Sequence, residues 1–156
     1  MFDAFLQQRL RQTIDGYDYV LLDCPPSLGQ LTQLALAVST EIIMPIQCEF
    51  FAMEGLVQMI EVIKNAMQHR KSLTATADND LQFAGIALTM YDAGVELTHE
   101  VENEVREFFG EIVFETVIPR DVAVSEAPSH ALPILDYAPR SRGARAYTEL
   151  CMELLS

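Results

Sequence analysis

Hydrophobic positions along the chain follow two spacings that alternate. Some segments carry apolar side chains at intervals of three and four, the spacing of amphipathic helices: residues 2–14, 28–38, 56–67, 97–109 and 147–154. Between them lie short, near-continuous apolar runs, typical of strands covered on both faces: residues 19–22, 41–46, 83–90 and 112–118. This alternation predicts an α/β fold with a mostly parallel sheet.

The predicted strands end in loops that contain proline, glycine or aspartate. The first ends at Asp23-Cys24-Pro25-Pro26, where two prolines forbid continuation as a central strand. Ligands of open parallel sheets bind beyond the carboxyl ends of the strands. We therefore expect these loops to lie along one rim of the sheet: those that begin at Asp23, Gln47, Asp92 and Arg120.

Cap residues and apolar stripes indicate where the helices end and what they bury. Ser27 and Ser141 can each accept an N–H group of a first helical turn, and Gly110 can end the helix of residues 97–109. The positions predicted to be buried are Leu97, Val101, Val105, Phe108 and Phe109 in that helix, and Tyr147, Leu150, Cys151 and Leu154 in the last one.

Composition narrows the classes of function. The formal net charge is −13, the wrong sign for a protein that binds phosphate backbones over its whole surface. A local basic cluster remains possible, with a solvated turn and helix start as its alternative: Arg120, Arg140, Arg142 and Arg145. No apolar run approaches the roughly 20 residues of a membrane span, and residues 1–11 show no signal peptide, so the sequence predicts a cytoplasmic protein.

Asp23 and Asp92 are the candidate functional carboxylates. Asp23 follows an apolar strand and could hold a hydrated Mg²⁺ beside a nucleotide phosphate, or it could cap the next helix. Asp92 ends another predicted strand and could accept a hydrogen bond from a base or an amine, or it could be an ordinary turn residue. The scattered cysteines and histidines have no metal-ligand spacing, so we expect no metal on them.

Several catalytic motifs are missing from the 156 residues. The sequence has no GxSxG turn of a serine hydrolase, no GxGxxG, and no GxxxxGK[ST] phosphate loop. A triphosphate is normally held by a row of backbone amides and a lysine, and these motifs supply both. Tight binding of a triphosphate therefore has no evident source in this sequence.

Several blocks together closely resemble the ParA/Soj partition ATPases, which are relatives of MinD. The block YDYVLLDCPPSLG at residues 17–29 resembles their Walker B and switch II segment. The other blocks occur in family order: residues 45–56, 88–92, 116–120, 125–130 and 137–144. The resemblance implies a P-loop NTPase-like, doubly wound, mostly parallel sheet with helices on both faces. It also implies one domain over residues 1–156 that is incomplete at its N-terminus and lacks the strand of the P-loop.

The resemblance further implies roles for particular residues. Asp23 corresponds to the Walker B acid that holds Mg²⁺ through water, and Met90 and Asp92 fall in the segment that reaches adenine. Pro119 and Arg120 belong to the loop on the other side of the base. Near the expected subunit interface lie Glu49 and Phe50. Members of the family bind ATP with Mg²⁺, form dimers around it, bind DNA non-specifically at the nucleoid and respond to a ParB-type partner.

The chain also departs from the family pattern. Asp121 and Ala123 stand where members usually carry asparagine and arginine, and Gly94-Val95 stands where many have arginine and threonine. We predict a partitioning ATPase in a truncated form with little or no hydrolysis. The alternative is a non-catalytic protein that keeps the scaffold for dimerisation or partner binding. Because a missing central strand leaves unpaired strand edges, we also expect a homodimer or a rearranged sheet.

Overall fold

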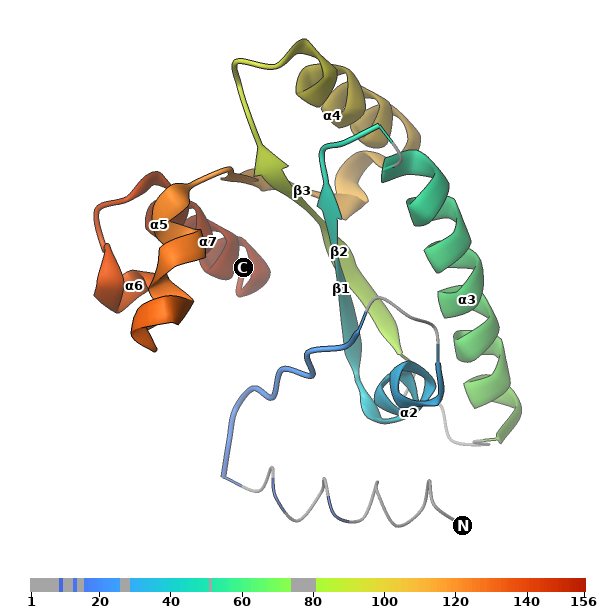
Figure 1. Cartoon of the computed structure of the whole chain (residues 1–156). Helices are drawn as coiled ribbons and strands as arrows, with labels where there is room; N and C mark the ends of the chain where they lie inside the picture. The colour runs from blue at the N-terminus through green and yellow to red at the C-terminus, as the bar shows by residue number, and fades with distance from the viewer. Residues whose placement is uncertain (1–8, 10–12, 14–15, 26–28, 51, 74–80) are drawn as a thin grey trace. The chain divides into compact units, whose positions relative to one another are not determined.

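The computed structural model describes residues 9, 13, 16–25, 29–50, 52–73 and 81–156 (Figure 1). The chain divides into two compact units, one of residues 1–42 with 60–82 and the other of residues 43–59 with 83–156. The predicted helix over residues 2–14 lies almost wholly outside the described residues, and so does the predicted cap Ser27.

The described strands form a three-stranded sheet in the order β1-β2-β3. Their bounds match the predicted segments closely: β1 is Glu41–Gln47, β2 is Gln82–Tyr91 and β3 is Val113–Pro119. Strands β2 and β3 run parallel, with Ile86 opposite Val113 and Tyr91 opposite Pro119. The predicted α/β class with a parallel sheet is confirmed.

Helices α2, α3 and α4 alternate with the three strands, as the apolar spacing predicts, and α5, α6 and α7 follow β3. Their bounds are Gln30–Val38 for α2, Ala52–Leu73 for α3, Glu96–Phe109 for α4, Val122–Glu126 for α5, Ile134–Tyr137 for α6 and Arg142–Leu154 for α7. Two predicted caps are confirmed: α4 ends at Gly110, whose φ is 57°, and the Ser141 hydroxyl accepts the Ala144 N–H at 3.1 Å. Among the described helices, none has the length and apolar character that a bilayer crossing requires.

The predicted strand at residues 19–22 is wrong. The structure gives these residues no regular secondary structure, and their side chains are exposed, with Tyr19 at 74% and Leu21 at 87%. A strand exists only where a neighbouring strand pairs with its N–H and C=O groups. Within the part of the chain that the structure describes, no strand pairs with this segment. Residues 19–22 therefore have the composition of a strand, but composition does not determine whether a second strand pairs with them.

The apolar face predicted for α4 is buried at its centre but not over its full width. Helix α4 buries Val101 and Val105 as predicted, together with Thr98, whereas Leu97 and Phe108 are exposed. The stripe through Thr98, Val101 and Val105 continues one turn later at Phe109, which is half-buried, rather than at Phe108.

Helix α7 confirms two of its four predicted positions and otherwise packs through smaller residues. Leu150 is buried as predicted, and Leu154 packs against a core that Ala87, Phe114 and Ile118 form with Ala146. The predicted burial of Tyr147 and Cys151 is wrong, because both are exposed. The small residues Gly143, Ala144 and Ala146 are buried instead, which lets the helix backbone approach its neighbours closely.

Strand β3 has an irregular register that a side chain of α7 compensates. Ile86 lies opposite Val113 but Leu88 lies opposite Val117, so β3 contains extra residues at this point. The Glu153 carboxylate accepts the N–H groups of Glu115 at 2.6 Å and Thr116 at 3.0 Å. Burial alone raises the pKa of Glu153, but these hydrogen bonds outweigh it and hold the pKa below its usual value.

Glu153→Ala is expected to lower the free energy of unfolding by about 1 kcal/mol, because water can replace part of the lost bonding at this half-buried position. Urea unfolding followed by circular dichroism measures the change. Because the folded pKa is lowered, the contribution is present above the unfolded value near 4.5 and is lost as the pH falls. Glu149→Ala removes an exposed carboxylate from the same helix and serves as the control. Equal effects of both substitutions would argue against the role of Glu153.

Candidate functional site

The loops that follow the three strands meet in the unit of residues 43–59 and 83–156. The Arg120 N–H donates to the Tyr91 carbonyl at 2.8 Å, which joins the end of β3 to the end of β2. The Cys48 N–H donates to the Thr89 carbonyl at 3.1 Å, which joins the end of β1 to β2. These loops therefore share one edge of the sheet, as expected for carboxyl ends of parallel strands.

An ion pair connects two residues that the sequence singled out separately. Arg120 Nη2 lies 3.4 Å from Glu49 Oε1, across 71 positions of sequence. Both side chains are more than half exposed, so the pair contributes little to stability. Its effect is to orient the guanidinium group at the sheet edge. Phe50, beside Glu49, is also exposed.

The segment that ends β2 has an unusual backbone. Met90 has a φ of 55°, in the left-handed region that residues other than glycine rarely adopt. Such a conformation costs on the order of 1 kcal/mol and persists only where surrounding contacts enforce it. Pro119, the residue paired with Tyr91 in the sheet register, lies at the matching end of β3.

Asp92 forms a turn. Its Oδ1 accepts the Gly94 N–H at 3.0 Å and its carbonyl accepts the Val95 N–H at 3.0 Å. The turn interpretation that the sequence left open is therefore what the geometry shows. Asp92 is exposed, and within the described residues no hydrogen bond reaches its Oδ2, so a ligand role remains compatible with the turn.

Asp121 organises the loop after Arg120. It caps α5 by accepting the Ala123 N–H at 2.9 Å through Oδ1, and it accepts the Gly143 N–H of α7 at 2.8 Å through Oδ2. Hydrogen bonds from Gly143 and then Ala123 hold the pKa of this carboxyl below its usual range. From the sequence, Asp121 was notable only as a departure from the family pattern. Its position just before a short helix was the signal that could have revealed the cap.

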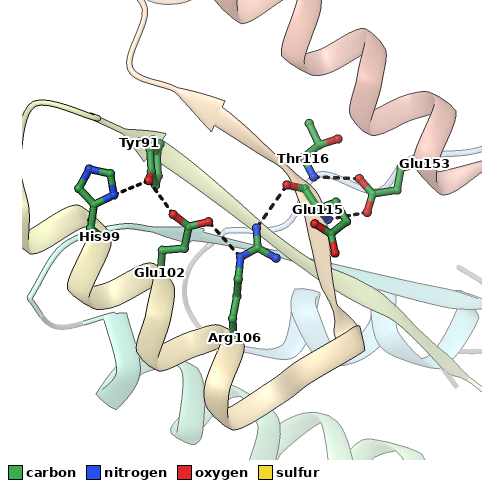
Figure 2. A network of polar contacts seen from close by, with 7 residues as sticks. All are labelled: Tyr91, His99, Glu102, Arg106, Glu115, Thr116 and Glu153. Carbon is green, nitrogen blue, oxygen red and sulfur yellow. Dashed lines mark hydrogen bonds and ion pairs between the residues drawn. The ribbon is translucent and has the colours of Figure 1, made fainter.

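A polar network joins helix α4 to strands β2 and β3, and most of it was not predictable from the sequence (Figure 2). It runs from Tyr91 and His99 through Glu102 to Arg106, which reaches the Glu115 carbonyl of β3. Only the i, i+4 spacing of Glu102 and Arg106 on α4 was readable beforehand as a possible ion pair.

Comparison with known proteins decides the family. A family model described as an AAA domain matches residues 2–76. The sporulation initiation inhibitor protein Soj of Bacillus subtilis is 44% identical over 149 residues, which cover 96% of this chain and 56% of Soj. The chain belongs to the ParA/Soj family. The chromosome partitioning protein ParA of Caulobacter vibrioides is 42% identical over 154 residues, which cover 95% of this chain and 55% of that protein.

Solved structures place this ParA/Soj chain among the P-loop NTPases. Cobyrinic acid a,c-diamide synthase from Mycobacterium smegmatis, solved with bound ADP and magnesium, is 29% identical with a TM-score of 0.72. The match covers 98% of this chain and 52% of the synthase. The cell division ATPase MinD of Pyrococcus furiosus is 23% identical with a TM-score of 0.74, covers 98% of this chain and 58% of MinD, and shows the shared fold. The chain spans about half the length of the curated relatives that it matches.

Asp23, the predicted Walker B acid of this ParA/Soj chain, lies in the other unit. It belongs to the exposed segment that follows residues 19–22 and has no regular secondary structure. The structure describes the two units separately, so the role of Asp23 toward Mg²⁺ stays a prediction. Within the described residues, no group of His, Cys, Asp and Glu side chains is arranged to hold a metal ion.

Proposed function

We propose that this ParA/Soj-family chain carries the base-binding side of an ATP site and acts in chromosome or plasmid partitioning. The observation that carries the proposal is the hydrogen bond from the Arg120 N–H to the Tyr91 carbonyl at 2.8 Å. It fixes the Met90–Asp92 segment beside Pro119 and Arg120, the two segments that family resemblance assigns to opposite sides of adenine. A structural relative of the chain was solved with ADP and magnesium bound.

The side chains at this edge suit a purine base. The exposed Asp92 carboxylate can accept hydrogen bonds from an exocyclic amine. The Arg120 guanidinium can stack on an aromatic ring, and its ion pair with Glu49 limits where it points. In this proposal Asp23 holds Mg²⁺ through water, and Glu49 and Phe50 lie near the interface with a second subunit.

The sequence lacks the usual motif that binds the phosphates of a nucleotide. The 156 residues contain no GxxxxGK[ST] sequence, so they provide no row of amides with a lysine for the β- and γ-phosphates. When bound, Mg²⁺ and the triphosphate supply the charge for phosphoryl transfer. In this proposal the residues of this chain bind the base. We therefore expect the 156-residue chain to bind ATP weakly and to hydrolyse it slowly or not at all.

Isothermal titration with ATP and Mg²⁺ tests this proposal. We expect saturable binding with a dissociation constant on the order of 1 mM, corresponding to about 4 kcal/mol. Asp92→Ala should weaken it about tenfold, because one hydrogen bond to a charged group is lost. Asp136→Ala, which removes an exposed aspartate from α6, is the control and should bind as the wild type does. An absence of heat at 10 mM ATP (about ten dissociation constants) contradicts the proposal.

A second candidate function is non-catalytic dimerisation or partner binding on the same scaffold. The exposed apolar run of residues 19–22, which pairs with no strand among the described residues, favours it, because such a segment can pair with another chain. Sedimentation should then show a homodimer whose dissociation follows Leu21→Asp, with no dependence on ATP. A monomer at all concentrations contradicts this candidate.

The remaining partners follow from the family and are proposals as well. They are a ParB-type protein and non-specific DNA, with a cytoplasmic, nucleoid-associated location. The net charge of −13 opposes DNA, so any DNA contact depends on the arginines of the C-terminal quarter: Arg120, Arg140, Arg142 and Arg145.

A further inference from the structure

The network of Figure 2 joins side chains of α4 to Tyr91 at the end of β2 and to Glu115 within β3. The Tyr91 hydroxyl donates to Glu102 Oε2 at 2.6 Å and lies 2.9 Å from His99 Nδ1. Glu102 Oε1 accepts from Arg106 Nε at 2.9 Å. Arg106 Nη2 then donates to the Glu115 carbonyl at 3.3 Å, in the irregular part of β3. One carboxylate, that of Glu102, therefore links β2 to β3 through two partners.

The same network also holds the residues on either side of Asp92. Tyr91 precedes Asp92 directly, and its carbonyl accepts the Arg120 N–H. His99 Nε2 lies 3.1 Å from the Ala93 carbonyl, and the His99 ring packs edge-on against the Tyr91 ring at 5.6 Å. The residues on both sides of Asp92 are thus fixed to α4, while the Asp92 side chain itself stays exposed.

The backbone of Met90 explains why such a restraint is needed. A residue other than glycine leaves the left-handed region for an extended conformation unless neighbouring contacts prevent it. Tyr91 is the next residue, and its hydroxyl donates a short bond of 2.6 Å to a carboxylate. Glu102 therefore supplies a restraint at the point where the chain is strained.

We propose that Glu102 is a positioning residue: through Tyr91 and Arg106 it holds the Met90–Asp92 segment and β3 in the geometry that selects the base of the nucleotide. The proposal rests on the proposed function for the nucleotide itself. Glu102 touches neither base nor phosphate in this scheme. It acts through Tyr91, so its loss changes selectivity among bases rather than creating or removing the site.

The protonation states support a constant restraint near neutral pH. The hydrogen bond to Glu102, followed by burial, raises the pKa of Tyr91 to about 12. Burial raises the pKa of Glu102, but the bonds from Tyr91 and Arg106 outweigh it and leave the pKa lowered. The neutral phenol and the carboxylate therefore persist together near neutral pH, and acid weakens the restraint when it protonates Glu102.

The test compares Glu102→Gln and Tyr91→Phe with a matched control, Glu104→Gln. Glu104 is exposed on the same helix, so the control removes the same charge without touching the network. The first measurement is hydrogen exchange of the free protein at the Gly94, Val95 and Arg120 amides. Both network variants should exchange there about tenfold faster, and the control should match the wild type.

The second measurement is the ratio of ATP to GTP affinity by titration, which a general loss of stability leaves unchanged. Glu102→Gln and Tyr91→Phe should reduce this ratio about fivefold, since a displaced Asp92 no longer distinguishes the bases. Faster exchange with an unchanged ratio overturns the positioning role. Unchanged exchange in both network variants overturns the restraint itself.

The failure of the proposed function has a different signature. If the wild-type chain binds neither nucleotide, the proposed function fails, while the exchange measurement still decides whether Glu102 restrains the segment. If the wild type binds ATP and the Glu104→Gln control loses selectivity as strongly as Glu102→Gln, the charge of α4 matters and the network does not, which also contradicts the inference.

Discussion

Gly85→Ala is expected to lower the free energy of unfolding by about 3 kcal/mol, because a methyl group overfills the packed interface of β2 and β3. A Cβ atom at this position lies 2.7 Å from Phe114 Cζ and 3.0 Å from the Ile112 carbonyl oxygen. Phe114 is buried in the core against Ala146 and Leu150, so its ring has no open space to enter. Urea unfolding followed by circular dichroism measures the loss.

Gly55→Ala is the matched control for this substitution. The same methyl group meets nothing within 4 Å there, and alanine is the better helix former, so the chain should gain about 0.5 to 1 kcal/mol. A double variant, Gly85→Ala with Phe114→Leu, should be more stable than the sum of the single effects, because the smaller side chain gives the methyl group room. Strict additivity would show that Phe114 is not the obstacle.

Asp121→Ala is expected to cost about 2 kcal/mol, the sum of a lost helix cap and a lost charged hydrogen bond. The carboxylate joins the first turns of α5 and α7 through Ala123 and Gly143, so its removal leaves two amides without their acceptor. Thermal and urea unfolding at pH 7 measure the change. The folded pKa is lowered, so the difference is fully present above the unfolded value near 3.8 and disappears as acid titrates the folded state.

The control is Asp136→Ala, because Asp136 is exposed and lies in the first turn of α6. It should change the free energy of unfolding by less than about 0.5 kcal/mol. Asp121→Asn separates charge from shape. Its amide keeps one acceptor oxygen but cannot serve both N–H groups, so about half of the loss should remain. A fully stable Asp121→Asn variant would mean that the two bonds do not act together.

Glu49 and Arg120 lie together at the carboxyl ends of the strands. The sequence placed both residues after strands, and their shared sheet edge followed from the rule for parallel sheets. The structure adds that they form an ion pair and that the Arg120 backbone is bonded to Tyr91. The functional roles of Glu49 and Arg120 are inferred from the family resemblance, and titration with ATP tests whether the site binds a nucleotide.

The sequence by itself determined the elements with strong local signals. The strands at residues 41–46, 83–90 and 112–118 and the helix ends at Gly110 and Ser141 were all predictable. A helix period, a left-handed glycine and a hydroxyl cap each act over a few residues, so a short stretch of sequence contains all the information. The family could also be inferred from the sequence, because each segment that resembles it is a contiguous stretch of residues.

Only the tertiary structure decided what depends on partners far along the chain. Residues 19–22 have the composition of a strand, yet whether they pair is settled by a second segment. Glu153 satisfies amides nearly forty positions away, and Glu102 joins Tyr91 to Arg106. Spacing within one helix or strand carries no information on such pairs. Their energies depend on which surfaces meet after the chain has folded, so no local pattern records them.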